Sequence, residues 1–324
     1  MATLLEVKNL KTSFVNRHEK TAVVNGLNFS IQAGETLGIV GESGCGKSVT
    51  SLSIMQLLND NAEMDGEIWF DGADLLKLKK KDMQHLRGNQ LAMIFQEPMT
   101  SLNPLQSIGK QIAEPLIKHL NLSKREAKAR VIQLLKEVGI PRAEEIYTDF
   151  PHQLSGGMRQ RIMIAMAMAC QPKLIIADEP TTALDVTIQA QILDLMKKLK
   201  NTNDTAIMLI THDLGVVAEM CDRVIVMYAG EIVEEADVYT LFKDPQHPYT
   251  KGLMASIPSM ATDQERLASI PGQVPPLNNM PKGCRFAPRC PFAMAKCHEE
   301  APPLFRKSSD QHGSCCWLYE EEAD

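Results

Sequence analysis

The sequence predicts an α/β fold in which a parallel sheet carries a phosphate-binding loop, with an antiparallel β layer near the N-terminus and a helical insertion. Three observations support this fold. Short apolar runs alternate with helical patterns, a glycine-rich loop follows the first of these runs, and strand signals disappear over residues 104–164. Apolar runs bounded by polar loops are typical of strands buried on both faces, and their alternation with helices favours right-handed crossovers.

The expected strands of the parallel sheet are five apolar runs, at residues 37–40, 91–95, 174–177, 207–210 and 223–227. Nearer the N-terminus, residues 22–31 alternate in polarity, and Asp71-Gly72 lies between two short strand-like segments. Alternation and an Asp-Gly pair favour antiparallel strands joined by tight turns. The N-terminal part is therefore expected to form an antiparallel β layer.

Residues 98–165 are expected to form a helical subdomain. Ser123 and Glu126 have the spacing of a capping box, and apolar residues follow them at helical spacing. After about Pro258 the chain becomes rich in proline and glycine and loses its periodicity. The sequence thus divides into a main nucleotide-binding domain, 1–258, and a small Pro- and Cys-rich C-terminal domain, 259–324.

The net charge and the composition limit the kinds of partner and the cellular compartment that we expect for this chain. A formal net charge of −6 over 324 residues argues against a nucleic-acid partner, which usually requires a basic surface. No run reaches the roughly 18 apolar residues that span a bilayer, and residues 1–10 lack the features of a signal peptide. We therefore expect a soluble chain on the cytoplasmic side, where thiol buffers keep cysteines reduced.

A phosphate-binding loop (P-loop) occupies residues 41–48, Gly-Glu-Ser-Gly-Cys-Gly-Lys-Ser, between a strand and a helix. Its glycines let backbone N–H groups surround phosphate oxygens, Lys47 neutralises the β and γ oxygens, and Ser48 supplies a Mg²⁺ ligand. The expected nucleotide contacts are Gly41, Ser43, Gly44, Cys45, Gly46, Lys47, Ser48 and Val49.

A nucleotide site also needs a carboxylate-bearing strand, and the run 174–177 ends in Asp178 and Glu179. Asp178 is expected to hold Mg²⁺, and Glu179 to orient and deprotonate the attacking water. Taken alone, this strand end is equally consistent with a solvated loop after a core strand. The P-loop decides between the two interpretations.

Residues 154–161, Leu-Ser-Gly-Gly-Met-Arg-Gln-Arg, open a further helix. Ser155 and the N–H groups of Gly156 and Gly157 can face a phosphate there, because a helix N-terminus favours anions. The alternative for a lone Ser-Gly-Gly is a simple loop. With the P-loop before it and the acidic strand after it, this segment resembles the signature sequence of ABC ATPases.

The resemblance assigns the remaining positions. Gln96 matches the Q-loop glutamine, which contacts Mg²⁺ or the water and relays to the helical subdomain. Residues 183–185, Ala-Leu-Asp, resemble the D-loop, and His212 matches the switch histidine at the γ-phosphate, although a lone histidine at a strand end is usually a core residue. Phe14 is expected to stack on adenine, with a core position as the alternative.

A closer resemblance is to the ATPases of dipeptide and oligopeptide permeases, at residues 94–104, 177–191 and 247–250 and in the tail. Met158 and residues 48–52 are similar to the D-type member of their unlike ATPase pair. The resemblance implies an ATP-hydrolysing subunit of an importer at the cytoplasmic face of the membrane. It also implies head-to-tail pairing with a second homologous ATPase subunit, two transmembrane permease subunits and an extracellular solute-binding protein.

Alternatives to this function come from two other classes. A soluble ABC ATPase of DNA repair or translation usually has two cassettes or a long coiled-coil insertion, and the sequence shows neither. A regulatory module that binds ATP without turnover would not need both Glu179 and His212. The solute stays open, because peptide, nickel and sugar-like importers share this kind of ATPase.

Five cysteines are concentrated in the C-terminal stretch, at Cys284, Cys290, Cys297, Cys315 and Cys316. A Pro-rich segment with little apolar core is commonly held by a metal, and unligated reduced thiols are the alternative. The spacing is wider than that of most zinc sites. The resemblance implies a [4Fe-4S] cluster at Cys284, Cys290, Cys297 and Cys316, with zinc as the alternative cofactor. Cys316 is chosen over Cys315 because the family's last cysteine commonly falls four residues after the position of His312.

Overall fold

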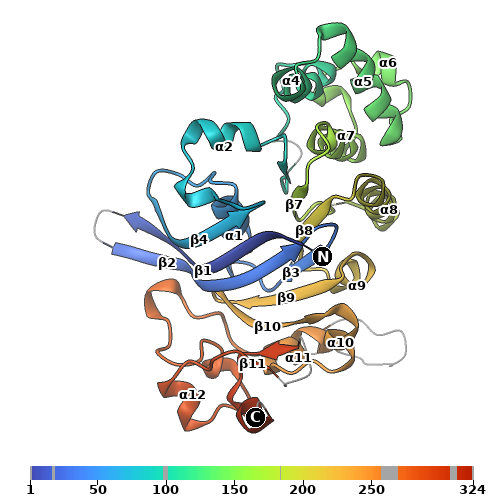
Figure 1. The fold of residues 1–324 in the computed structure, drawn as a ribbon. Helices are drawn as coiled ribbons and strands as arrows, with labels where there is room; N and C mark the ends of the chain where they lie inside the picture. The colour runs from blue at the N-terminus through green and yellow to red at the C-terminus, as the bar shows by residue number, and fades with distance from the viewer. Residues whose placement is uncertain are drawn as a thin grey trace. The chain divides into compact units, whose positions relative to one another are not determined.

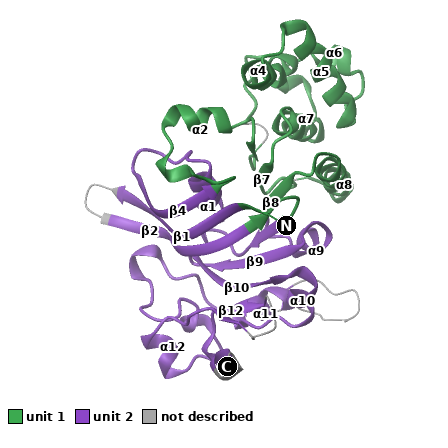
Figure 2. Cartoon of the chain, viewed as in Figure 1, with its two compact units in different colours: residues 1–4, 31–36, 70–209 green, residues 5–30, 37–69, 210–324 purple. Residues whose placement is uncertain are grey.

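The computed structural model describes residues 2–16, 19–97, 101–182, 184–256, 269–306 and 312–322. The chain forms two compact units (Figure 2). Unit 1 contains residues 1–4, 31–36 and 70–209, and unit 2 contains residues 5–30, 37–69 and 210–324. The P-loop and the cysteine-rich C-terminal stretch therefore belong to the same unit.

The main sheet of unit 2 has the strand order β11-β12-β10-β9-β3 (Figure 1). Its strands are β3 (Thr36–Val40), β9 (Arg223–Tyr228), β10 (Glu231–Asp237), β11 (Phe305–Arg306) and β12 (Gly313–Ser314). The pair β3 and β9 is parallel, as predicted for residues 37–40 and 223–227, and β10 pairs antiparallel with both β9 and β12. The C-terminal stretch thus extends a sheet that begins next to the P-loop.

A second sheet, with β1 (Thr3–Asn16), β2 (Glu19–Gln32), β4 (Ala62–Phe70) and β5 (Ala73–Asp74) in the order β2-β1-β4-β5, occupies the part of the chain where the antiparallel layer is expected. Strand β5 (Ala73–Asp74) follows a turn at Asp71 and Gly72, whose φ angles are 49° and 82°. Two successive positive φ values are the geometry of a type I′ turn, which explains why Asp-Gly stands there.

The helices of unit 2 are α1 (Lys47–Ile54), α9 (Leu214–Met220), α10 (Val238–Lys243), α11 (Pro248–Ala255) and α12 (Ala295–Glu299), with short turns η3 (Leu277–Asn279), η4 (Ala287–Arg289) and η5 (Trp317–Glu322). Phe286, from the C-terminal stretch, is 2% exposed and packs in one cluster with Val226, Tyr228 and Tyr249. The C-terminal stretch therefore shares a core with β9 and α11. The predicted domain boundary near Pro258 lies outside the described residues.

In unit 1 the strand order is β8-β7-β6, with β6 (Leu91–Ile94), β7 (Leu174–Asp178) and β8 (Ala206–Ile210). The pair β6 and β7 is parallel and in register from Leu91 opposite Leu174 to Ile94 opposite Ala177. All five predicted runs of the parallel sheet therefore form strands. Along the chain, η1 (Leu75–Lys77) and α2 (Lys80–Leu86) precede β6, and α8 (Val186–Asn203) follows β7.

The predicted helical insertion consists of α4 (Ile108–Leu120), α5 (Lys124–Glu137), α6 (Ala143–Ile146), η2 (Pro151–Gln153) and α7 (Gly156–Met168). The capping box of α5 is confirmed, since the Glu126 N–H donates to Ser123 Oγ at 3.3 Å and the Ser123 N–H to Glu126 Oε2 at 2.9 Å. In the parts of the chain that the structure describes, no helix is long and apolar enough to cross a membrane.

Candidate functional site

The P-loop links β3 to α1 in unit 2, and packing fixes its shape at Gly41. A Cβ atom added to Gly41 would lie 2.2 Å from the Met227 carbonyl oxygen and 2.8 Å from Cys45 Sγ. Gly46, the N-cap of α1, has φ 99°, a conformation that side chains of L-residues rarely adopt. These two glycines are therefore required by the loop itself. Gly44 has open space where a Cβ would lie, but its φ of 80° also favours glycine.

Lys47 lies against the loop that it belongs to. Its Nζ donates to the carbonyl oxygens of Gly41 at 2.8 Å and Glu42 at 3.0 Å, and lies 3.7 Å from Cys45 Sγ. The side chain is buried, while Ser43, Gly44 and Ser48 are exposed. The amine is therefore held at the centre of the loop, where a nucleotide phosphate would accept its hydrogen bonds.

The Cys45 side chain is buried beneath the P-loop and is not exposed on its surface. Its side chain is 1% exposed, and its carbonyl oxygen accepts from the Gly230 N–H at 2.9 Å. Burial raises the pKa of the Cys45 thiol, although Lys47 opposes the shift. A neutral buried thiol is a poor nucleophile, so Cys45 contributes packing and its backbone N–H group.

His212 belongs to the same unit as the P-loop. The preceding residue, Thr211, donates its N–H to the Ile39 carbonyl oxygen of β3 at 3.2 Å, and Asp213 caps α9. His212 is exposed at this point, beyond β8 and beside the strand that leads into the P-loop. The sequence expectation of a histidine at the γ-phosphate is compatible with this position and stays a prediction.

The carboxylates of Asp178 and Glu179, the expected Mg²⁺ ligand and general base, lie in unit 1, at the carboxyl edge of the β6 and β7 pair. Asp178, 5% exposed, ends β7, and Glu179 follows it with φ 48°, in the left-handed region. Gln96 Nε2 donates to Glu179 Oε2 at 2.8 Å, and Thr182 Oγ1 donates to the same oxygen at 2.8 Å. The parallel register brings Gln96 to Glu179, although 83 residues separate them.

The Ser-Gly-Gly segment opens α7 as expected. Ser155 is the N-cap, and its Oγ accepts from the Met158 N–H at 3.3 Å. Gly156 is exposed, and a Cβ added there would meet nothing within 4 Å, whereas one added to Gly157 would lie 3.2 Å from Ile188 Cγ2. The N-terminus of α7 is thus open toward solvent at Gly156, where an anion could approach.

One further contact connects α7 to the segment that follows Glu179. Gln160, 2% exposed in α7, donates from Nε2 to the Pro180 carbonyl oxygen at 2.5 Å, directly after Glu179. The expected D-loop continues from there, although its Ala183 lies outside the described residues. Asp185 caps α8 by accepting from the Ile188 N–H at 3.0 Å. Phe14, the expected adenine contact, is half-buried in β1 of unit 2.

Four C-terminal cysteines lie close enough to affect one another electrostatically. Burial raises the pKa of the Cys284, Cys290 and Cys316 thiols, the last to about 11, and the neighbouring thiols raise them further. Among Cys284, Cys290, Cys297 and Cys316, every pair interacts in this way. Backbone N–H groups also point at the sulfurs, as at Cys297 Sγ, 3.5 Å from the Met294 nitrogen.

Cys315 lies beside acidic side chains as well as thiols. Burial raises its pKa to about 12, with further increases from Glu231, Glu235, Cys284 and Cys316, and it lines a cavity of about 290 Å³ together with Glu231, Glu235 and Cys284. Within the described ranges, no group of three or more His, Cys, Asp or Glu side chains is arranged to hold a metal ion. The four thiols thus influence one another's pKa, but the described residues do not place them around a metal ion.

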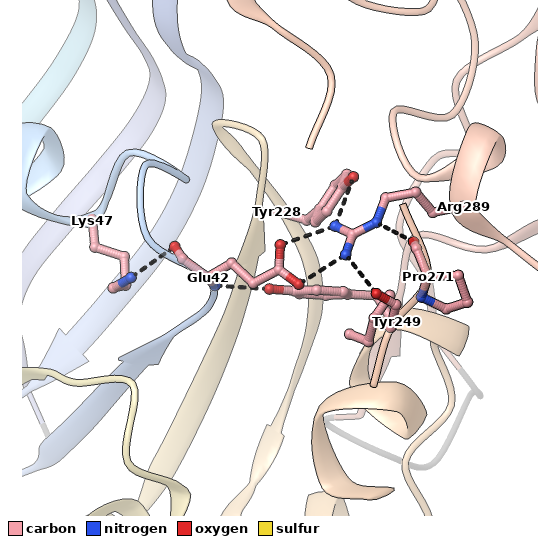
Figure 3. Close-up of polar contacts among 7 residues, drawn as sticks. Glu42, Lys47, Tyr228, Tyr249, Pro271 and Arg289 are labelled. Atoms are coloured by element: carbon pink, nitrogen blue, oxygen red, sulfur yellow. Dashed lines mark hydrogen bonds and ion pairs between the residues drawn. The ribbon is translucent and has the colours of Figure 1, made fainter. Parts of the chain in front are cut away.

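The sequence did not predict the contacts of Glu42, the second residue of the P-loop. Its backbone N–H donates to Tyr249 Oη at 2.8 Å, and its carboxylate forms an ion pair with Arg289 at 2.9 Å (Figure 3). Arg289 stands directly before Cys290 in the cysteine-rich stretch. Only its place in that motif could have marked it, because partners 247 residues apart leave no local pattern.

Two family models match the chain. One, described as ABC transporter, covers residues 24–182, and the other, described as oligopeptide/dipeptide transporter, C-terminal region, covers residues 233–297. Among curated relatives, the oligopeptide transport ATP-binding protein AppD of Bacillus subtilis (strain 168) is 56% identical over 99% of this chain and 98% of its own length. The dipeptide transport ATP-binding protein DppD of Lactococcus lactis subsp. cremoris (strain MG1363) is 52% identical over 99% of this chain and 92% of its own.

Solved structures are similar over the main part of the chain. A dimeric post-hydrolysis state of the ATP-binding cassette MJ0796, bound to ADP and Pi, matches with a TM-score of 0.66 and 29% identity. The match covers 72% of this chain and all but 1% of that cassette. A second dimeric structure of that cassette matches with a TM-score of 0.65.

Proposed function

The chain belongs to the ABC transporter family of ATPases, in its oligopeptide and dipeptide branch, and from this we propose that it is the ATP-hydrolysing subunit that powers import of dipeptides or oligopeptides. The observation that carries the proposal is the Glu179 carboxylate, held by Gln96 and Thr182 at the end of β7. A carboxylate oriented in this way suits a general base. The test of this function is to remove the Glu179 carboxylate, which should stop ATP turnover while ATP still binds.

ATP and Mg²⁺ are the expected cofactors, and the residues fit them. In unit 2, the loop from Gly41 to Val49 would present backbone N–H groups to phosphates, Lys47 would neutralise their charge, and Ser48 at the start of α1 would be a Mg²⁺ ligand. In unit 1, Asp178 and Gln96 would supply oxygen ligands of the kind that Mg²⁺ prefers. Phe14 would stack on the adenine.

The roles in hydrolysis follow from these positions. Glu179 accepts a proton from the attacking water, and its two hydrogen-bond donors hold the carboxylate in one orientation. His212 would donate to the γ-phosphate. The Mg²⁺ ion, when bound, neutralises charge that develops on the phosphate oxygens.

Hydrolysis also needs a second homologous ATPase subunit. The exposed N-terminus of α7 at Ser155, Gly156 and Gly157 would complete the site on the partner's P-loop, and the partner's signature segment would complete this one. A heterodimer of unlike subunits is the expected form. Closure of the pair would move the helical subdomain, α4 to α7, against two transmembrane permease subunits at the cytoplasmic face, with a solute-binding protein outside.

We further propose that Cys284, Cys290, Cys297 and Cys316 hold a [4Fe-4S] cluster. The mutual effects of these thiols on their pKa values support a shared site. The described residues form no group arranged to hold a metal ion, so the choice of a cluster over zinc rests on the resemblance of the tail to peptide-permease ATPases. Cys316 interacts with all of the other three, whereas Cys315 interacts with Cys284 and Cys316 and with the carboxylates of Glu231 and Glu235, which supports Cys316 as the fourth ligand. The division into domains at 1–258 and 259–324 stays part of this proposal.

Anaerobic purification of the full chain tests the cluster. We expect a brown protein with broad absorbance near roughly 400 nm and about four irons per chain. Cys316→Ser should lose the iron, and Cys315→Ser, the matched control, should keep it. A colourless preparation that holds one zinc or no metal would refute the cluster, and the reverse order of the two variants would assign the fourth ligand to Cys315.

A further inference from the structure

Arg289 is the point at which the cysteine-rich stretch contacts the P-loop (Figure 3). Its Nη1 and Nη2 donate to the two carboxylate oxygens of Glu42, at 2.9 and 3.1 Å. The remaining donors reach Tyr228 Oη at 3.4 Å and the carbonyl oxygens of Pro271 at 2.9 Å and Ile270 at 3.3 Å. All five N–H groups of the guanidinium therefore have acceptors, which fixes the side chain in one orientation.

Burial strengthens this ion pair. The Arg289 side chain is 5% exposed and the Glu42 side chain 28% exposed, and the guanidinium lies over the rings of Tyr228 and Phe286. Solvent screens a partly buried ion pair less than an exposed one, and two parallel hydrogen bonds between arginine and carboxylate make the pair stronger still. The pair thus restricts Glu42 far more than an exposed salt bridge would.

Glu42 transmits this restriction to the groups that bind phosphate. Its N–H donates to Tyr249 Oη, and its carbonyl oxygen accepts from Lys47 Nζ. Tyr249 is fully buried and packs against Tyr228 and Phe286. One residue of the P-loop is therefore held through its side chain, its N–H and its carbonyl group at once, and the last contact is with the phosphate-binding lysine.

The other end of the connection is the cysteine-rich stretch. Arg289 ends η4 and directly precedes Cys290, and Cys284 and Cys290 both pack against the cluster that contains Tyr228, Tyr249 and Phe286. A shift of this stretch therefore moves Arg289 with it. Since the ion pair holds Glu42 to Arg289, the shape of the P-loop depends on whether residues 283–298 are ordered.

We propose that Arg289 is a positioning residue that holds Glu42 and couples the state of the cysteine-rich stretch to ATP affinity at this chain's own P-loop. The proposal rests on the proposed function for the ATP site and is independent of which metal the cysteines bind. By linkage, nucleotide bound at the P-loop also orders residues 283–298, to the same extent in free energy.

Binding of Mg-ATP to the purified full-length chain, measured by calorimetry, tests the coupling. Arg289→Gln and Glu42→Gln are each expected to raise the Kd about tenfold, within the range usual for coupled sites. The double variant should be no weaker than either single one, because both remove one interaction. Arg306→Gln is the matched control, since it breaks an ion pair between the same stretch and Glu235 of β10, and should bind as the wild type does.

Wild-type affinity in both single variants, or a double variant in which the two effects multiply, would overturn the coupling. Lys47→Ala separates the two proposals. If the wild type fails to bind Mg-ATP, the proposed function fails. If Lys47→Ala binds weakly while Arg289→Gln and Glu42→Gln bind as the wild type does, the function stands and the role of Arg289 is refuted.

Hydrogen exchange gives a second readout that a purely structural arginine would not change. Mg-ADP should slow amide exchange over residues 283–298 in the wild type and in Arg306→Gln, and should have no such effect in Glu42→Gln. This measurement serves even where Arg289→Gln does not fold, because Glu42→Gln removes the ion pair from the P-loop side. Exchange that is equally slowed in Glu42→Gln, or unchanged in the wild type, would contradict the coupling.

Discussion

Glu179→Gln is expected to lower ATP turnover by the assembled transporter about 10²- to 10⁴-fold, the contribution typical of a general base. The amide cannot accept the proton of the attacking water, while Lys47, Ser48 and Asp178 still hold Mg-ATP. The substitution is nearly isosteric, and the contacts from Gln96 Nε2 and Thr182 Oγ1 end on an oxygen that glutamine also has. The loss should therefore appear in kcat and leave the Kd for ATP within about twofold, as for an interaction made only in the transition state.

Phosphate release and nucleotide binding should be measured on the same preparation. Glu63→Gln is a suitable control, because Glu63 is an exposed carboxylate paired with Lys20 in a surface salt bridge. It should turn over ATP as the wild type does. A Glu179→Gln transporter that hydrolyses ATP at a near wild-type rate would show that another group is the base.

Gly156→Asp is expected to slow hydrolysis at the partner subunit's P-loop while sparing ATP binding at this chain's own. A Cβ added at Gly156 meets nothing within 4 Å in the described part of this chain, and an acidic residue at its N-terminus stabilises helix α7. The fold should therefore tolerate the change. A carboxylate at an anion site repels the γ-phosphate across the dimer, and we expect a loss of roughly 10²-fold, the size usual for losing one preorganised donor.

Labelling with a photoreactive ATP analogue, followed by separation of the two ATPase subunits, distinguishes the sites. Gly156→Ala is the matched control, since it adds the Cβ without charge and should keep most of the activity. Labelling lost only at this chain's own P-loop would contradict the arrangement in which the signature segment acts on the partner's nucleotide.

Local patterns in the sequence were sufficient for the elements and for the position of each motif. The runs that form β3, β6, β7, β8 and β9 are apolar and short, and the Ser123 capping box is read from four consecutive residues, so each depends on neighbours along the chain. The P-loop glycines can also be recognised from the local sequence, because the backbone conformation of the loop requires glycine at Gly41 and Gly46.

The contacts that orient the site could not be predicted in this way. Gln96 reaches Glu179 because β6 and β7 are parallel and in register, and Gln160 reaches Pro180 because α7 packs beside the end of β7. The pair of Glu42 and Arg289 joins residues 247 positions apart. Such pairs are set by tertiary packing, which a single sequence encodes only through the sum of its core residues.

ATP-driven uptake of a labelled oligopeptide by membrane vesicles that contain the whole transporter is the most direct test of the central claim. With wild-type chain, ATP supplied on the side of this subunit should accumulate peptide above the level set by diffusion, and Glu179→Gln in the same complex should abolish the accumulation. Peptide uptake that is independent of ATP, or equal in the wild type and Glu179→Gln, would contradict the assignment of this chain as the subunit that powers peptide import.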